Sequence, residues 1–368
     1  MGRGEGGVRE VAWVFLRLGT IAFGGPVAHT AMMRDELVRR RGWLDDARFL
    51  DLVGATQLIP GPNSTELAIH LGHERARWRG LVVAGLCFIV PAALMVTALA
   101  WAYVTYGQTP AVGGILYGLV PAVIAIIVHA LLALVRTALK TAGLAVLAAV
   151  VLGLYLAGVN ELLLLAAGAL CAVALRVRPS GSALGLPVLI DAPGSQLAEL
   201  FATMLKIGAV LYGSGYVLLA FLRGDFVERL GWITEQQLID AISIGQVTPG
   251  PVFTTATFVG YLVAGLPGAF LATVAIFLPS FLFVGLLTRL TDFLRSRPWT
   301  SALLDGVNAT AFALMAGVTW QLAGSAIVDP LTAAIAAVTL LLLWRTSLNS
   351  AWYLAAGAAV GLAHTVLT

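Results

Sequence analysis

The chain has 368 residues, of which 59% are hydrophobic and 11% charged, and its mean hydropathy is +0.92. Because soluble domains carry roughly 25% charged residues, this composition excludes an ordinary soluble protein and indicates an integral membrane protein. The net charge of +3 and the pI of about 9.0 do not indicate a nucleic-acid partner, since the basic residues follow the expected membrane topology.

Apolar stretches close to the ~20 residues that cross a bilayer recur along the chain. In the first half we expect spans at 11–30, 79–102, 111–135, 140–157 and 160–176, with a hairpin at 48–75. In the second half we expect spans at 197–220, 268–290, 300–323, 328–345 and 348–366, with a hairpin at 237–263. Each hairpin is broken by Pro-Gly-Pro into arms too short to span ~30 Å, so it should be re-entrant. The predicted fold class is all-α integral membrane, with about ten transmembrane helices plus two re-entrant broken-helix hairpins.

The two halves are copies of one sequence. Gly42-Trp43 and Gln57-x-x-Pro-Gly-Pro recur 189 residues later as Gly231-Trp232 and Gln246-x-x-Pro-Gly-Pro. This offset, which slips to 188 between Thr65 and Gly72, also pairs Arg17 with Lys206, Gly24 with Gly213, Asp51 with Asp240, and Pro91 with Pro279. We predict an N-terminal repeat at 1–178, a cytoplasmic linker at 179–196 and a C-terminal repeat at 197–368. Because five crossings is an odd number, the second repeat should be inverted.

The distribution of charge predicts the orientation. Sixteen of the 22 Lys and Arg residues, among them Arg41 and Arg75, fall on one predicted face, which the positive-inside rule makes cytoplasmic. The opposite face receives Arg3, Arg9, Arg223 and Arg229. Both termini would then lie outside, and the two hairpins would enter from opposite sides and meet near the midplane.

The hairpin tips are the candidate site. Proline suits the start of a helix, and the unpaired N–H groups and dipole of a helix N-terminus attract anions. Hydroxyls and amides beside the breaks can donate to an oxyanion; the alternative is that they only cap the broken helices. The substrate-binding candidates are Gln57, Pro60, Gly61, Pro62, Asn63, Ser64 and Thr65 in the first half, and Gln246, Pro249, Gly250, Pro251, Thr254 and Thr255 in the second.

Arg17 and Lys206 are further substrate-binding candidates, because a cation inside a span is costly unless it is compensated. An anionic substrate is one compensating partner; the alternative is that both side chains reach the lipid headgroups. Gly24 and Gly25 are included because glycine allows the backbone to open or approach closely beside the hairpin.

Glu66 has no acidic counterpart in the second repeat, where Thr255 takes its place. A carboxylate without a partner inside the membrane is a proton-coupling candidate. Pairing with His70, four residues on, or with an arginine is the structural alternative.

Several function classes have no support in the sequence. It contains no nucleotide fingerprint, Walker motif or zinc-ligand spacing. Cys87 and Cys171 lie in apolar runs without ligand spacing and are expected to be packing residues. We therefore expect no cofactor, no metal site and no enzymatic activity.

The segments 23–29 (FGGPVAH), 36–38 (ELV), 41–44 (RGWL) and 58–68 (LIPGPNSTELA) resemble the chromate ion transporter family in its long two-domain form. The resemblance covers both halves. It implies export of chromate across the bacterial inner membrane, driven by the ion gradient and conferring chromate resistance, with Gly24, Gly25, Pro26, Pro60, Gly61 and Pro62 required. Gly213-Ser214-Gly215 departs from the Gly-Gly-Pro form, so the resemblance implies no equivalent contact in the second half.

The resulting hypothesis is an alternating-access secondary transporter whose two tips bind a divalent oxyanion, with Glu66 as a proton-antiport residue. The expected partners are chromate and the lipid bilayer. Two rival functions stay open: inward transport of sulfate or another oxyanion, and a membrane scaffold without transport. A homodimer is one assembly that the sequence leaves open.

Overall fold

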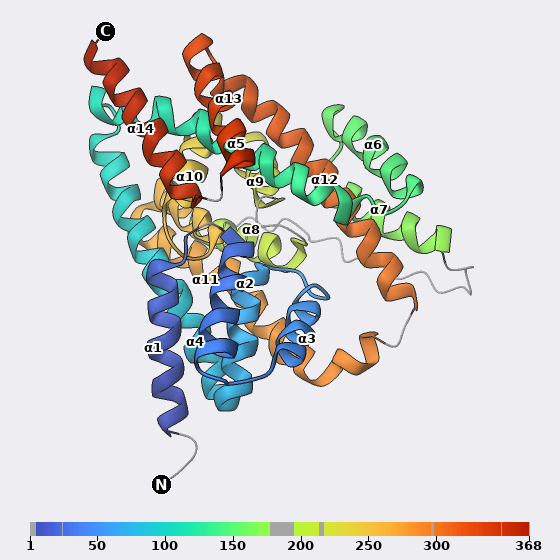
Figure 1. Ribbon diagram of the computed structural model, residues 1–368. Coiled ribbons are helices and arrows are strands. Elements are labelled where there is room, and N and C mark those ends of the chain that lie inside the picture. Colours follow the sequence, from blue (N-terminus) through green and yellow to red (C-terminus); the bar gives the residue numbers. More distant parts are fainter. Residues whose placement is uncertain are drawn as a thin grey trace.

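The computed structural model describes residues 5–23, 25–176, 195–212, 217–295, 298–346 and 348–367, and every regular element in these ranges is a helix (Figure 1). The helices of the first half are α1 (Glu5–Ile21), α2 (Gly25–Arg34), the π-helix η1 (Asp35–Arg40), α3 (Asp46–Thr56), α4 (Asn63–Tyr106), α5 (Pro110–Ala138), α6 (Ala142–Leu156) and α7 (Glu161–Arg176). Those of the second half are α8 (Gln196–Val210), α9 (Leu218–Leu222), the π-helix η3 (Arg223–Arg229), α10 (Glu235–Val247), the 3₁₀-helix η4 (Val252–Thr254), α11 (Thr255–Arg295), α12 (Pro298–Ala326), α13 (Pro330–Arg345) and α14 (Ser350–Leu367).

The described helices confirm an all-α membrane protein. Five stretches are long and apolar enough to cross a membrane, and they lie in α4, α5, η4 with α11, α12, and α14. Large apolar side chains stand on the outer surface, including Phe270 at 68% and Trp320 at 76% exposure, as expected for lipid contact. Helices α6, α7 and α13 have 15 or 16 residues and are therefore only ~23 Å long. The described residues therefore do not confirm the predicted count of about ten spans.

The predicted single spans at 11–30 and 197–220 are wrong. The chain breaks after α1, and α2 with η1 runs back beside it, so that Glu10 near the start of α1 contacts Arg41 after η1 at 3.2 Å. In the second half Glu199 near the start of α8 likewise contacts Arg229, the last residue of η3, at 3.4 Å. Hydropathy hides both reversals, because an apolar hairpin and an apolar span have the same composition.

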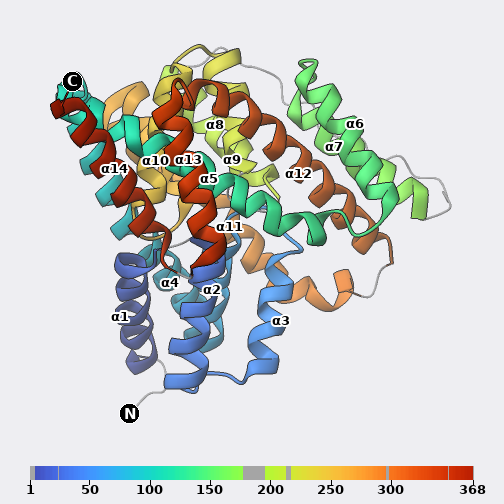
Figure 2. The same ribbon diagram turned by 45° about the horizontal axis from the view of Figure 1, so that its top comes forward.

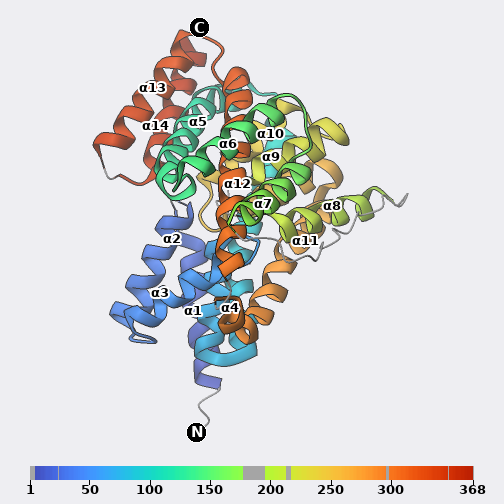
Figure 3. The same ribbon diagram turned by 90° about the vertical axis from the view of Figure 1, so that its right-hand side faces the viewer.

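This reversal changes the topology in two respects. Glu10 also contacts Arg75 at 2.7 Å, so the start of α1 lies on the arginine-rich side. The sequence had placed Arg9, which precedes Glu10, on the opposite face, and that prediction is wrong. The inversion of the second repeat was predicted from five crossings in each half, a number that included these two single spans, so that argument no longer supports it. Figure 3 shows α1, α2 and α3 gathered at one end of the molecule.

Helices α4 and α11 are each bent back on themselves. Ala76 and Arg77 interrupt α4, and Ala264 and Gly265 interrupt α11, 188 residues later. A side chain on Gly80 would clash with the carbonyl of Gly72, although residues eight apart in a straight helix are about 12 Å apart. Residues 63–75 and 255–263 are therefore separate short arms that follow the Pro-Gly-Pro turns, as the sequence predicted.

The two halves interlock reciprocally. Helix α1 packs on α4 as α8 packs on α11, while α13 and α14 pack against α5 of the first half as α6 and α7 pack against α12 of the second. Helices α4 and α11 pack against each other, and so do α5 and α12. Figure 2 shows α13 and α14 beside α5, and α6 with α7 beside α12. Contacts that are repeated with the partners exchanged define a pseudo-two-fold arrangement.

Candidate functional site

The Pro-Gly-Pro turns lie at the interface between the repeats. Glycine is the one residue of each tripeptide that has an N–H group. The Gly61 N–H donates to the Leu211 carbonyl at 2.7 Å, and the Gly250 N–H donates to the Ala22 carbonyl at 2.9 Å. Leu211 and Ala22 follow the last residues of α8 and α1 and are themselves 189 residues apart. Each tip therefore binds the broken helix end of the other repeat.

Both tips require glycine for conformational reasons. Gly61 has a φ of 138° and Gly250 a φ of 95°, values that residues with a side chain rarely adopt. Pro62 caps α4 from the position before its first residue, and Pro251 precedes η4 in the same way. The two prolines thus stand one residue earlier than the first helical position that the sequence predicted.

The polar side chains at the two tips differ in how they are bonded. The Thr254 and Thr255 hydroxyls donate to the carbonyls of Pro251 and Val252, each at 2.8 Å, so both hydroxyls at the second tip have local backbone partners. At the first tip the Thr65 hydroxyl is fully buried and has no hydrogen-bond partner within the described residues. Buried polar groups are nearly always paired, so the first tip is the exceptional one.

Glu66 is the other exception. Its side chain is fully buried, and neither carboxylate oxygen has a hydrogen-bond partner in the described part of the chain. His70 lies one turn further along α4, but its two ring nitrogens are also unpaired there. The predicted alternative, a Glu66–His70 pair, is therefore absent from the described structure.

A hydroxyl from the second repeat completes the surroundings of the first tip. A side chain on Gly61 would meet the Glu66 Oε1 and would lie 2.7 Å from the Ser280 Oγ on α11. Tyr212, which follows Leu211, donates to the Leu58 carbonyl at 3.4 Å and is close enough to Glu66 to interact electrostatically. Sequence reasoning missed Ser280 and Tyr212, because neither belongs to a motif and both reach the tip from the other repeat.

Other predicted site residues have varied surroundings. Pro60, Gly61, Pro62 and Ser64 are buried with Thr65, and so are Gln246, Pro249, Gly250 and Pro251, whereas Asn63 is half-buried. Gln57 is exposed, whereas its counterpart Gln246 is buried. Gly25 is buried and has a φ of 75°, whereas Gly24 lies outside the described residues.

Arg17 and Lys206 are held by carboxylates of the protein. The Lys206 Nζ lies 2.6 Å from the Asp225 Oδ1, and Arg17 lies 3.8 Å from Glu36. The 189-residue offset relates Glu36 to Asp225, so the ion pair itself is repeated. The repeat alignment contains this signal, but sequence reasoning followed only the cations. Anion binding by Arg17 and Lys206 stays a prediction, and the structure provides a different partner for each charge.

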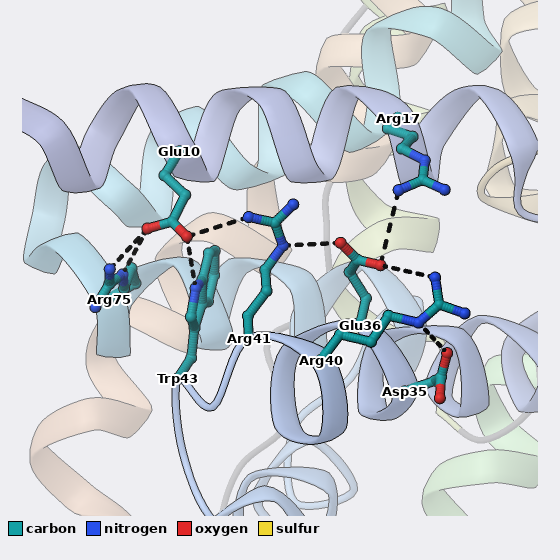
Figure 4. Close-up of polar contacts among 8 residues, drawn as sticks. All are labelled: Glu10, Arg17, Asp35, Glu36, Arg40, Arg41, Trp43 and Arg75. Atoms are coloured by element: carbon teal, nitrogen blue, oxygen red, sulfur yellow. Dashed lines mark hydrogen bonds and ion pairs between the residues drawn. The ribbon is translucent and has the colours of Figure 1, made fainter.

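In the first repeat the ion pair belongs to a larger charged cluster, drawn in Figure 4. Glu36 accepts a hydrogen bond from Arg41 at 2.8 Å and also faces Arg40 at 3.7 Å. A cavity of about 380 Å³ beside this cluster is lined by Arg17, Glu36 and Arg40 together with apolar side chains of α1 and α2.

Glu10 ties the start of α1 to this cluster. It accepts hydrogen bonds from Arg75, Trp43 and Arg41 at 2.7 to 3.2 Å (Figure 4). Burial alone would raise the pKa of Glu10, but the hydrogen bonds from these three side chains outweigh it and lower that pKa. The stabilisation from this carboxylate is therefore present above its unfolded-state pKa and is lost as the pH falls.

Comparison with known proteins identifies the class of protein that this fold and site define. The family model described as "Chromate transporter" matches twice, at residues 9–173 and 198–362. The chain belongs to the chromate transporter family. It is 36% identical to a chromate transport protein of Cupriavidus metallidurans, over 96% of this chain and 92% of the relative. No solved structure matches it.

Two further relatives are similar over most of their length. A protein of Pseudomonas aeruginosa called a chromate transport protein is 35% identical over 84% of this chain and 79% of its own length. One of Synechococcus elongatus called a probable chromate transport protein is 31% identical over 92% of this chain and 90% of its own length.

The ion pair between Lys206 and Asp225 leads to a prediction about stability. Their side chains are 18% and 9% exposed, so Asp225→Asn leaves two cations, Lys206 and Arg229, without this carboxylate. We expect a loss of about 3 kcal/mol in unfolding free energy and a smaller loss for Lys206→Met combined with Asp225→Asn. Thermal unfolding in detergent, followed by tryptophan fluorescence, measures both.

The same variants separate a structural role from anion binding. With the ammonium already paired, Lys206→Met should leave the half-saturation concentration for chromate within about twofold. A tenfold rise in a variant that still folds would show instead that Lys206 contacts the anion.

Proposed function

We propose that this chain is a secondary transporter that exports chromate across the bacterial cytoplasmic membrane and thereby confers chromate resistance. The family match over both repeats supports the substrate. The observation that carries the mechanism is the pair of tips, each bound to the other repeat through the Gly61 and Gly250 N–H groups. Two repeats joined in this way can rock against each other about a site between them.

In this mechanism the site at the tips opens alternately to each side of the membrane. The short arms 63–75 and 255–263 start at the tips and turn sharply at Arg77 and Gly265. Because these turns separate the arms from the long parts of α4 and α11, the arms can move while the long helices stay in place. Such an arrangement is typical of transporters with broken helices.

The membrane potential suits export of this substrate. Moving one elementary charge through 100 mV changes its free energy by about 2.3 kcal/mol. A potential that is negative inside therefore favours the exit of the chromate dianion by about 4.6 kcal/mol per 100 mV. Export needs no ATP under these conditions, and uptake of the same ion would need an opposing gradient.

The first experiment measures labelled chromate in inside-out vesicles energised so that their interior is positive. We expect accumulation that stops when an ionophore collapses the potential, because the potential supplies the driving force. Excess sulfate should compete weakly if chromate is the preferred ion. Accumulation of sulfate in place of chromate would show that the chain exports another oxyanion, whereas the inward rival predicts sulfate accumulation in right-side-out vesicles.

The scaffold alternative has its own control. Pro62→Ala combined with Pro251→Ala removes the residues that cap the two broken arms and should abolish accumulation. If vesicles that contain the wild-type chain accumulate no chromate either, the transport proposal fails.

Glu66 is proposed to bind a proton together with the anion. An ionised carboxylate beside Gly61 would repel a dianion at the same tip, whereas a protonated one can donate a hydrogen bond to it. Through this residue the proton and chromate would move in the same direction, which differs from the antiport expected from the sequence. Because the pair carries one net negative charge, the potential would then favour its exit by about 2.3 kcal/mol per 100 mV, half of the value for the dianion alone. The titratable neighbours of Glu66 are His70 on the same helix and Tyr212, which follows α8.

Glu66→Gln tests this role, because glutamine resembles the protonated carboxyl group. Wild-type affinity for chromate should fall as the pH rises, over a range in which chromate stays a dianion, and the variant should show a flat profile. Glu74→Gln is the matched control, since Glu74 lies on the same helix but pairs with Arg48 at 2.5 Å. A variant with the wild-type pH profile would exclude Glu66 from proton coupling.

We retain the inverted orientation of the second repeat as a proposal. Ala47 and Gln236 are exposed and occupy equivalent positions in the first turns of α3 and α10, the helices that lead to the two tips. Cysteines placed at these positions, in a chain lacking Cys87 and Cys171, should react with an impermeant thiol reagent from opposite sides of the membrane. Labelling of both from one side would show that the repeats are parallel.

A further inference from the structure

The two tips are equivalent by descent but have different surroundings. Gly61 borders the Glu66 carboxylate and the Ser280 hydroxyl, whereas Gly250 borders the Ala92 methyl group and the Gly19 carbonyl. The repeat offsets make Ala92 the counterpart of Ser280 and Thr255 the counterpart of Glu66. The second tip therefore lacks both the carboxylate and the hydroxyl that border the first.

A third position follows the same pattern. Tyr212, whose side chain lies near Glu66, has Phe23 as its counterpart in the first repeat. The tyrosine hydroxyl is thus also found only in the group of positions that surrounds the first tip. At these three positions the first tip has a carboxylate, a serine hydroxyl and a phenol, where the second has a threonine, an alanine and a phenylalanine.

The hydrogen-bonding state of the polar groups points to a ligand at the first tip. The side-chain oxygens of Thr65, Glu66 and Ser280 are all buried and have no hydrogen-bond partner within the described residues. The Glu66 Oε1 and the Ser280 Oγ border the same point beside Gly61 and are no more than about 5 Å apart, a gap that one bridging oxygen atom can fill. Leaving three such groups unpaired is costly unless something binds there.

We propose that the chain binds a single tetrahedral oxyanion, at the Gly61 tip, and that Ser280 of the second repeat is one of its ligands. This inference rests on the proposed chromate transport and deepens it by assigning the site to one tip and adding a residue to it. The Ser280 and Thr65 hydroxyls donate to the oxygen atoms of the anion, and protonated Glu66 donates to another. The Gly250 tip contributes the matching hinge contact and holds no anion.

The location of Ser280 on the second repeat connects anion binding to the movement of the two repeats. Thr65 and Glu66 start an arm of the first repeat, while Ser280 follows Pro279 in the long part of α11. An anion that bonds to all three side chains joins the two repeats. Movement of the arm relative to α11 pulls these ligands apart and releases the anion.

The test compares Ser280→Ala with its mirror substitution Ala92→Ser in purified chain reconstituted into proteoliposomes, with chromate as the probe. Loss of one hydrogen bond to a charged group should raise the half-saturation concentration about tenfold in Ser280→Ala, with the maximal rate within about twofold. Ser280→Thr keeps the hydroxyl and should retain most of the affinity, and Ala92→Ser should behave as the wild type does.

Stoichiometry provides an independent measurement. Equilibrium dialysis of the purified wild-type chain should give one chromate bound per chain, and Ser280→Ala should weaken that binding. Two equivalent ions per chain, or an unchanged half-saturation concentration in Ser280→Ala, would overturn the single-site assignment while leaving chromate transport intact. Failure of the wild-type chain to bind or transport chromate would instead overturn the proposed function.

Discussion

The structure depends on satisfying the backbone where helices break inside an apolar interior. A broken helix leaves carbonyl and N–H groups without intrahelical partners, and lipid offers them none. Here the carbonyl that follows α1 or α8 accepts the N–H of the glycine at the tip of the other repeat. Neither repeat can complete these bonds alone. The reciprocal docking of Gly61 and Gly250 therefore determines how the halves are joined and places both tips at their interface.

Two equivalent cations of the repeats are also paired within the protein. Arg17 with Glu36, and Lys206 with Asp225, form the same ion pair in both repeats, so the cations that looked available for substrate already have carboxylate partners. Unpaired polar groups gather elsewhere, around Gly61, where Thr65, Glu66 and Ser280 lack partners within the described residues. These cations of the α1–α2 and α8–α9 hairpins thus have carboxylate partners, whereas the buried polar groups at one tip have none in the described part of the chain. Such groups are free to bind a polar ligand.

Duplication and divergence contribute different parts of this protein. Duplication supplies the matched breaks, bends and ion pairs, because these support the packing of both halves. Divergence supplies the chemistry: Ser280 replaces the alanine found at Ala92, and Glu66 replaces the threonine found at Thr255. A pseudo-symmetric scaffold with an asymmetric site can keep two similar end states while binding its substrate in one place.

The sequence by itself determined the membrane class, the repeat, the family and the positions of the Pro-Gly-Pro breaks, because each depends on composition or on local spacing. The long helices α5 and α12 follow the predicted ranges closely, and the short arms at 63–75 and 255–263 lie within the two predicted hairpins. Tertiary structure alone decided that 11–30 turns back on itself, that Lys206 pairs with Asp225, and that Ser280 reaches the Gly61 tip. Hydropathy records how apolar a segment is but not its direction, and contacts between residues about 20 to 220 positions apart depend on how the repeats pack.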